Sequence, residues 1–256
     1  MDKKFFYIAN WKMYWTFDEA ITFATKNYDN LIALCQGQSD QLVLCPTFPA
    51  IYPLAQMFKD TNIAVAAQDC SEHHKGAFTG QVSANHLKSA GCDFCIIGHS
   101  ERRLLLSESS QLVANKCLQL IEAGIVPIIC IGETLEQNRQ GVTLQALEEQ
   151  IIPIATVLKT KQPMLDNVVI LFAYEPVWAI GSGQTPMAEH IETVYAWLST
   201  YLIRLVPSLR YRFIYGGSIT SNTVGLLKPL PFVGGLLIGA ASLDFQELEK
   251  IVKCAI

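Results

Sequence analysis

The stretch Val168-Val-Ile-Leu-Phe-Ala-Tyr-Glu-Pro-Val-Trp-Ala-Ile-Gly-Ser-Gly-Gln-Thr-Pro186 is the part of the sequence from which we infer the fold. Its first five residues are apolar and mostly β-branched, which predicts a fully buried strand. Met187 to Leu205 then has apolar residues at roughly helical spacing. Glu175 stands between the two, and Pro176 disfavours a helical conformation at Glu175. The stretch therefore predicts a buried strand with a carboxylate at its exit, followed by a loop and a helix.

The loop itself has a flexible centre and stiffer ends. Gly181 and Gly183 flank Ser182, whereas Pro176–Trp178 and Gln184–Pro186 frame this tip. A base at the root of a hinged flap suits an enzyme that must exclude water from its active site. Spacing alone leaves open the alternative of an ordinary strand-to-helix loop with an exposed glutamate.

The same alternation of short apolar runs and longer amphipathic segments continues along the whole chain. Continuous apolar strands that alternate with helices predict a parallel sheet covered by helices. Eight such units in 256 residues favour a closed (β/α)8 barrel over an open doubly wound sheet, and we expect a single domain over residues 1–256. The predicted strands are Phe5–Ala9, Gln41–Cys45, Ile63–Ala67, Phe94–Ile97, Val126–Ile131, Val168–Tyr174, Arg212–Tyr215 and Gly235–Ile238, and predicted helices include Asp18–Tyr28, Leu112–Ala123 and Leu144–Leu158.

Composition excludes several classes of protein. Half of the residues are apolar, 16% are charged and the formal net charge is -4. Without a Lys/Arg cluster, this balance argues against nucleic-acid binding. No apolar run reaches membrane-spanning length, and the N-terminus lacks the features of a signal peptide, so we expect a cytoplasmic protein.

The eight cysteines are scattered through the chain. Cys45, Cys95 and Cys130 fall inside apolar, strand-like runs, which favours buried free thiols in a reducing compartment. Cys92-Asp-Phe-Cys95 has no second pair at zinc-finger spacing and no thioredoxin-like context. We therefore expect no metal site.

In a barrel of this kind the active site lies just past the carboxyl ends of the strands. Asn10 and Lys12 follow the first strand two residues apart, so both side chains can point the same way from an extended chain. His99 follows the fourth strand and precedes a helix N-terminus, where Ser100 can cap and Glu101 suits the helix dipole. A solvated lysine and a structural histidine are the alternatives. The positive end of the helix disfavours an imidazolium, so we expect a neutral His99 that can donate a hydrogen bond to a carbonyl.

Glycines mark the exits of the last two predicted strands, in Tyr215-Gly-Gly-Ser218 and Leu237-Ile-Gly-Ala-Ala-Ser242. Glycine lets backbone N–H groups approach an anion closely, and barrels often bind phosphate at these two loops. The expected phosphate ligands are Ser218, Gly239 and Ala240, joined by Gly181 when the loop after the sixth strand closes.

These segments, in this order, resemble the triosephosphate isomerase family. The resemblance extends from Asn10 to Ser242 and includes Ile96-Ile-Gly-His-Ser-Glu-Arg-Arg103 and Cys130-Ile-Gly-Glu133. It implies a TIM barrel and an aldose–ketose isomerase that interconverts dihydroxyacetone phosphate and D-glyceraldehyde 3-phosphate. No metal or organic cofactor is needed, because proton transfer between adjacent carbons requires no electron carrier.

The resemblance also implies roles for individual residues. Glu175 would move the proton, His99 and Lys12 would stabilise the enediolate, and Asn10 would help to position the substrate. Glu101 would have a supporting role. The segment Gly76-Ala-Phe-Thr-Gly80 would interdigitate in a homodimer, with Thr79 reaching the active site of the partner.

Position 240 departs from the family pattern, because many members have two glycines where this chain has Gly239-Ala240. A positive φ at an alanine would carry strain. We therefore expect Ala240 to adopt a negative φ and to keep its N–H at a usable angle.

Two other functions remain open. Another phosphate-binding barrel enzyme, such as an aldolase, would need a Schiff-base lysine or a metal site, and Lys12 is the only lysine evident at a strand end. A catalytically inactive barrel kept for binding would tolerate the loss of Glu175 or His99, and both are present.

Overall fold

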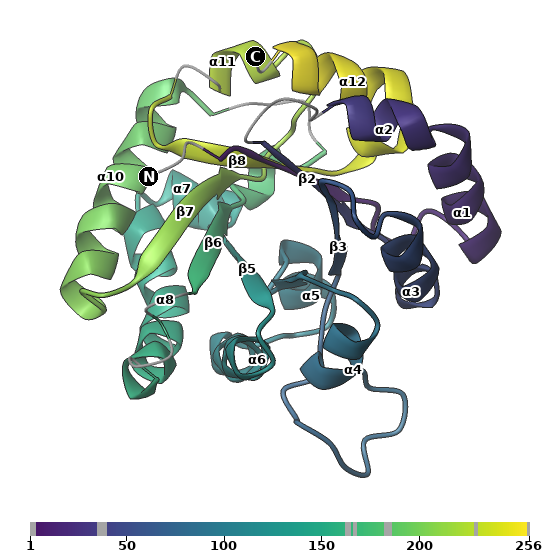
Figure 1. Cartoon of the computed structure of the whole chain (residues 1–256). Coiled ribbons are helices and arrows are strands. Elements are labelled where there is room, and N and C mark those ends of the chain that lie inside the picture. The colour runs from purple at the N-terminus through teal and green to yellow at the C-terminus, as the bar shows by residue number, and fades with distance from the viewer. Residues whose placement is uncertain are drawn as a thin grey trace.

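Eight parallel strands close into one barrel, with β1 paired to β8 (Figure 1). This computed structural model describes residues 4–34, 40–161, 165, 168–181, 186–227 and 230–254. The predicted barrel is thereby confirmed. The strands are β1 Phe6–Asn10, β2 Gln41–Cys45, β3 Ile63–Ala67, β4 Phe94–Ile97, β5 Val126–Ile131, β6 Val169–Tyr174, β7 Arg210–Tyr215 and β8 Val233–Ile238.

Four strands have the predicted bounds, and the differences in the others arise from pairing. Strand β7 begins two residues early because Arg210 pairs with Val169 of β6. Strand β8 begins at Val233, which pairs with Phe213 of β7. A partner strand thus extends each of these elements beyond its apolar run.

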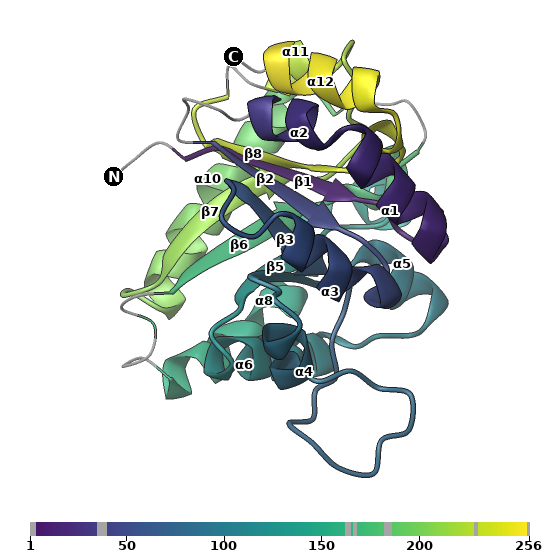
Figure 2. The same cartoon turned by 45° about the vertical axis from the view of Figure 1, so that its right-hand side comes forward.

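Helices cover the outside of the barrel (Figures 1 and 2). They are α1 Phe17–Lys26, α2 Tyr28–Leu34, α3 Phe48–Met57, α4 Ala84–Ser89, α5 Ser100–Leu105, α6 Ser110–Glu122, α7 Leu135–Arg139, α8 Thr143–Thr160, α10 Ala188–Leu205, α11 Val224–Leu227 and α12 Phe245–Cys254, with short 3-10 helices η1 Val177–Ala179 and η2 Ala240–Leu243.

The predicted continuous helix Asp18–Tyr28 is wrong. Asn27 ends α1, because its side-chain amide donates to the carbonyl of Phe23 at 2.8 Å and its backbone leaves the helical region. A second helix starts at Tyr28. The backbone N–H of Asn27 donates to the same carbonyl at 3.1 Å, so the side chain adds a second bond at the C-terminal end of α1.

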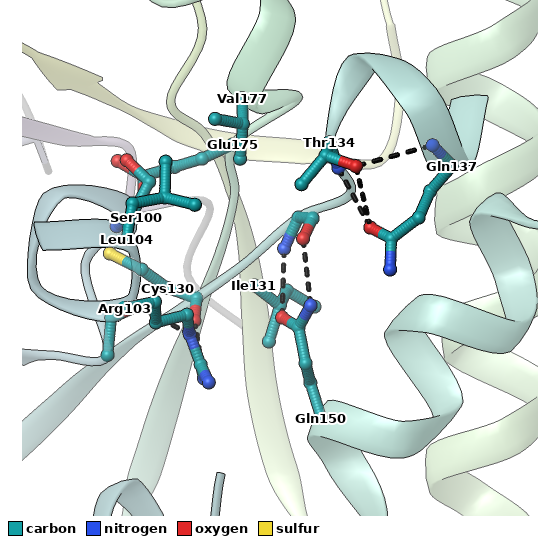
Figure 3. A pocket seen from close by; sticks show the side chains of 12 residues that line it. Ser100, Arg103, Leu104, Cys130, Ile131, Thr134, Gln137, Gln150, Glu175 and Val177 are labelled. Carbon is teal, nitrogen blue, oxygen red and sulfur yellow. Dashed lines mark hydrogen bonds between the residues drawn. The ribbon is translucent and has the colours of Figure 1, made fainter. Parts of the chain in front are cut away.

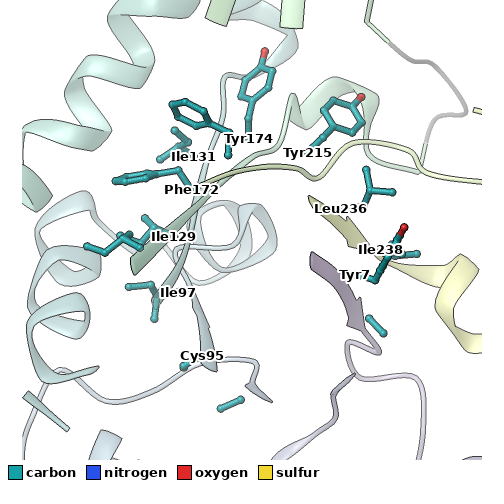
Figure 4. Close-up of a cluster of buried hydrophobic side chains, with 14 of the residues drawn as sticks. Tyr7, Cys95, Ile97, Ile129, Ile131, Phe172, Tyr174, Tyr215, Leu236 and Ile238 are labelled. Atoms are coloured by element: carbon teal, nitrogen blue, oxygen red, sulfur yellow. The ribbon is translucent and has the colours of Figure 1, made fainter. Parts of the chain in front are cut away.

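The strands separate two apolar layers. Alternate residues such as Ile8, Val43 and Leu171 fill the inside of the barrel. Their neighbours, such as Tyr7, Leu44 and Phe172, pack outward among the helices (Figure 4). Because both faces are buried, polar side chains accumulate where the strands end.

One segment leaves the body of the molecule. Both views show the chain between β3 and α4 as a loop that extends away from the barrel wall (Figures 1 and 2). The N–H of Ser71 donates to the carbonyl of Val82 at 2.8 Å and closes the base of this loop. Phe78, near its tip, remains 41% exposed and stacks on His73.

Barrel closure requires glycine at position 235. Gly235 of β8 lies opposite Phe6 of β1, and a Cβ at Gly235 would lie 2.4 Å from the Phe6 carbonyl oxygen. We expect Gly235→Ala to lower the free energy of unfolding by about 1–3 kcal/mol, because overpacking forces the two strands apart.

The matched control is Gly225→Ala in α11, where a Cβ would have no neighbour within 4 Å. This change should raise the free energy of unfolding by up to about 1 kcal/mol, since alanine favours helix over glycine. Denaturant titration of both variants is the measurement, and equal effects would contradict the role given to Gly235.

Candidate active site

A cavity of about 350 Å³ opens where strands β1, β4, β6, β7 and β8 end. Its lining brings together residues that lie as far apart in sequence as Asn10 and Ala240. Eight of the residues predicted from the sequence line it: Asn10, Lys12, His99, Glu175, Gly181, Ser218, Gly239 and Ala240.

The two other predicted residues lie elsewhere. Glu101 is outside the lining but contacts Lys12. Thr79 is exposed in the projecting loop and is not among the residues that line this cavity. Of the loop tip that the sequence predicts to be flexible, Gly181 is described and has a φ of 66°, whereas Ser182, Gly183, Gln184 and Thr185 lie outside the described residues.

Glu175 follows β6 directly and is only 2% exposed. Its Oε1 lies 3.1 Å from Nε2 of His99, and its Oε2 accepts the backbone N–H of Ser100 at 3.1 Å. Burial raises the pKa of the Glu175 carboxyl, but the His99 ring, the Ser100 N–H and the Lys12 cation lower it more, so the net pKa lies below the ordinary value. Glu175 is therefore ionised at neutral pH and able to accept a proton.

Two glycines allow the chain at Glu175 to pack this closely. A Cβ at Gly132 would lie 1.7 Å from the Glu175 carbonyl oxygen, and one at Gly216 would lie 2.8 Å from its Cγ. From the sequence we expected no role for Gly132, and we expected Gly216 to ease the approach of an anion and not of Glu175. The signal was a glycine at the end of a buried strand, which often marks a close backbone approach.

His99 is the N-cap of α5, so the expected cap at Ser100 is wrong by one residue. The imidazole Nδ1 accepts the backbone N–H of Glu101 at 3.2 Å. The ring therefore satisfies one of the free N–H groups of the helix, a role that serine and aspartate side chains usually have. The structure thus fixes the ring by one nitrogen and directs the other toward Glu175.

Two influences act on the protonation of His99. Burial is the largest single influence and lowers the pKa of the ring, but the Glu175 and Glu101 carboxylates together raise it more, with a net rise. The hydrogen bond from Glu101 opposes this rise, because a nitrogen that accepts an N–H cannot carry a proton of its own. In this fixed geometry His99 is neutral and its proton is on Nε2.

Lys12 adopts a backbone conformation that is unusual for a residue other than glycine. Its φ is 49°, so the extended geometry expected for Asn10 and Lys12 is wrong, although both side chains still line the cavity. The Lys12 N–H donates to Oδ1 of Asn10 at 3.1 Å, and the Lys12 carbonyl accepts Nε2 of Gln68 at 2.7 Å. Its ammonium lies 2.5 Å from Oε1 of Glu101. These contacts hold a conformation that is otherwise disfavoured.

At the opposite end of the cavity the backbone can supply hydrogen-bond donors. Gly239 is the N-cap of the 3-10 helix η2, and Ala240 is its first residue. Ala240 is not among the residues with positive φ in the described chain, which confirms the expectation for its backbone. The first N–H groups of a helix lack partners within it, so this end can supply donors to an anion.

The start of the loop after β6 is firmly anchored. Glu133 is fully buried, and it accepts the indole N–H of Trp178 at 2.7 Å and the hydroxyl of Tyr174 at 3.0 Å. Its carbonyl accepts the N–H of Val177 at 3.1 Å. These bonds attach the Pro176–Trp178 end of the loop to the exit of β5.

A second, smaller cavity of about 160 Å³ lies on the other side of Glu175 (Figure 3). Gln150 crosses it and bonds to both the N–H and the carbonyl of Gly132, at 3.1 and 2.8 Å. Cys130 also lines it, and burial, followed by the nearby Glu175, raises the pKa of its thiol. Cys130 is thus an unreactive thiol, and the polar groups here support the backbone beside Glu175.

In the described chain, no group of three or more His, Cys, Asp and Glu side chains is arranged to hold a metal ion. The described helices include none with both the length and the apolar character needed to cross a bilayer. Beside the imidazole of His99 the site offers the carboxylate of Glu175, the ammonium of Lys12 and a set of backbone donors, and Glu247 adds a second carboxylate to the lining.

The lowered pKa of Glu175 predicts how its contribution to stability changes with pH. Because the unfolded chain has the ordinary pKa of about 4.3, ionised Glu175 contributes stability that is present above that value and is lost as the pH falls through the folded pKa. Carboxyl-carbon NMR should show Glu175 titrating below the unfolded value, with the signal assigned by its loss in Glu175→Gln. A midpoint above the unfolded value would contradict the assigned contacts.

Comparison with known proteins agrees with this geometry. Residues 5–255 match the family model described as triosephosphate isomerase. The chain is 35% identical over 248 residues to the triosephosphate isomerase of Aquifex aeolicus, which covers 95% of this chain and 96% of that protein. It is 37% identical over 256 residues to that of Chlamydia muridarum, covering 98% and 91%, and 38% identical over 245 residues to that of Bordetella pertussis, covering 95% and 94%.

Proposed function

Since the chain belongs to the triosephosphate isomerase family, we propose that its cavity interconverts dihydroxyacetone phosphate and D-glyceraldehyde 3-phosphate with Glu175 as the base. The observation that carries this assignment is the contact between a buried, ionised Glu175 and a His99 whose proton is on Nε2. A base and a hydrogen-bond donor in contact can act on one substrate, the base on a carbon and the donor on the adjacent carbonyl.

Glu175 takes the proton from the carbon next to the carbonyl and returns it to the neighbouring carbon. The substrate must enter between Glu175 and His99, so their contact at 3.1 Å is the arrangement before binding. Glu175 then exchanges its contact with His99 for one with the substrate. Because the carboxylate already lacks water, it needs little reorganisation to act as a base.

His99 and Lys12 stabilise the negative charge that develops on the substrate oxygens. His99 donates through Nε2, and its orientation is fixed by the bond between Nδ1 and Glu101. Lys12 supplies a compact cation, which Glu101 holds at the cavity edge. Asn10, only 5% exposed, supports the Lys12 backbone and is placed to orient the substrate.

The phosphate binds at Ser218, Gly239 and Ala240, where backbone N–H groups are available. Gly181 joins them when the loop after β6 closes, since it already lines the same cavity. Closure excludes water and suppresses loss of phosphate from the intermediate.

The base assignment is tested by Glu175→Asp. Shortening the side chain by one methylene should reduce kcat by on the order of a hundredfold, because a small misplacement of a catalytic group is costly. The measurement is a coupled isomerase assay on the purified protein.

Glu149→Asp is the matched control, because Glu149 is exposed on α8 and does not line the cavity. That variant should keep wild-type kcat. Near-normal turnover of a well-folded Glu175→Asp protein would exclude Glu175 as the base.

We also propose that the enzyme is a homodimer in which the projecting loop of each subunit enters the other. A cavity of about 460 Å³ lies beside Lys12, His99 and Glu101 and is lined by Met13, Phe48, Leu105 and Leu106. These four side chains are exposed, Met13 to 91%. This apolar cavity is complementary to the projecting loop, which carries Phe78 near its tip. Insertion of the loop into the cavity of the partner would bring Thr79 to Lys12 of the partner subunit.

The root of the loop is rigid enough for such a role. Asp69 bonds to Lys116 at 2.6 Å and to Arg102 at 2.8 Å, and Glu108 bonds to the same two cations at 2.9 and 2.7 Å. This cluster attaches the loop to α5 and α6. Buried free thiols such as Cys45 and Cys95 support a reducing compartment, and we propose the cytoplasm.

Replacing residues 73–80 with a short Gly-Ser linker tests the assembly. The bond between Ser71 and Val82 should keep the loop base closed, so the variant should fold as a monomer with weak activity, because Lys12 loses its contact with the partner. Light scattering and the isomerase assay are the measurements.

Lys75→Ala, also exposed in the loop, is the control and should remain an active dimer. A wild-type protein that is monomeric and fully active at the assay concentration would contradict the proposal.

A further inference from the structure

Glu247 lines the phosphate end of the cavity, together with Ser218, Ala240 and Ala241. It comes from the first turn of α12 and not from a strand exit. Its Oε1 accepts the backbone N–H of Ser221 at 2.8 Å, and its Oε2 accepts the Ser221 hydroxyl at 3.1 Å. One carboxylate therefore links the helix after β8 to the loop after β7.

The hydrogen bonds of the Glu247 side chain are unusual for the third residue of a helix. Asp244 precedes α12 and accepts the N–H of Glu247 at 2.8 Å, which is the first half of a capping box. In a complete box, the third helical residue bonds back to the backbone N–H of the cap. Three other helices of this chain complete it, with the pairs Thr16 and Glu19, Ser83 and His86, and Thr134 and Gln137. In α12 the carboxylate turns to Ser221 instead.

Fixing Ser221 also fixes Ser218. Thr223 accepts the N–H of Thr220 at 2.9 Å and donates its hydroxyl to the carbonyl of Ser218 at 3.4 Å. The loop from Ser218 to Thr223 is thus internally bonded. Ala240 begins η2, and Glu247 lies in α12, the next helix along the chain. The bonds from Glu247 to Ser221 therefore set the distance between η2 and the loop after β7, which are the two sides of the phosphate site.

The charge of Glu247 opposes the binding of an anion there. Among the residues that line the cavity, the carboxylates are Glu175 and Glu247, and the ammonium of Lys12 is already paired with Glu101. A second carboxylate at the phosphate end repels a dianion. Any favourable effect of Glu247 on binding therefore comes from its hydrogen bonds, and it is net favourable only where it exceeds this repulsion.

We propose that Glu247 is a positioning residue of the phosphate site, which holds the loop after β7 against η2 and α12 through Ser221. The inference rests on the proposed binding of phosphate at Ser218, Gly239 and Ala240. It separates two properties of one side chain: its hydrogen bonds favour binding and its charge disfavours binding.

Two substitutions separate these properties. Glu247→Gln keeps an acceptor for the Ser221 N–H and removes the charge, whereas Glu247→Ala removes both. The measurement is the Kd of inorganic phosphate by titration calorimetry, with kcat, KM and the thermal midpoint determined for each form. Glu249→Ala is the control on the same helix, because Glu249 bonds to Lys253 and does not line the cavity.

We expect phosphate affinity to fall in the order Gln variant, wild type, Ala variant. The Gln variant should bind about two- to fivefold more tightly, the range for one partly exposed charge interaction. The Ala variant should bind up to about fivefold more weakly, because the lost hydrogen bonds weaken binding by about three- to tenfold and the lost repulsion offsets part of this effect. KM should follow the same order while kcat changes less than KM, because uniform binding is affected. The control should bind as the wild type does.

Any other order overturns the proposal. If the Ala variant fails to fold, the comparison of the Gln variant with the wild type still decides, because unchanged or weaker binding by the Gln variant contradicts the opposing charge. A wild-type enzyme that isomerises but shows no phosphate binding refutes the phosphate assignment together with this inference. A wild type that binds phosphate with a different order among the variants refutes the role of Glu247 alone.

Discussion

A buried carboxylate that remains ionised must be satisfied by its neighbours, and the architecture around Glu175 meets this requirement. The N–H of Ser100 and the ring of His99 come from the exit of β4, and the backbone at Gly132 comes from the exit of β5. None of these groups is close to Glu175 in the sequence. Only a closed parallel barrel brings the strand exits that carry them to one place, so the fold and the charge depend on each other.

The sequence predicts the elements of this barrel well, because strand and helix periodicities are local. It also predicts which residues follow the strands, and therefore most of the cavity lining. It does not predict contacts between distant loops. Gln68, Gly132 and Glu247 act through partners on other elements, such as the Lys12 carbonyl, the Glu175 backbone and Ser221. Gln68 and Glu247 carry no such signal in the sequence, and the glycine at position 132 indicates a close backbone approach without identifying the partner.

Side chains that bond to the backbone at helix ends explain the remaining errors. At Asn27 the side-chain amide bonds to the Phe23 carbonyl, which also accepts the Asn27 N–H, and at His99 an imidazole takes the place of the serine expected as a cap. In both cases the boundary of a helix depends on which nearby polar side chain bonds to its backbone. Residue preference alone does not predict that choice. The same reasoning applies to Glu247, whose expected partner is in its own helix and whose actual partner is in another loop.

The pairing of β1 with β8 has a consequence for the way the chain is made. Residues 6 to 9 can complete their hydrogen bonds only after residues 235 to 238 have been synthesised. Until then, β1 and the most recent strand are both open edges of an incomplete parallel sheet, and such edges invite pairing between chains. Contacts of this sequence separation also form slowly. A nascent chain therefore spends nearly its whole synthesis with one edge of β1 unpaired. Aggregation during translation is the main hazard of this topology.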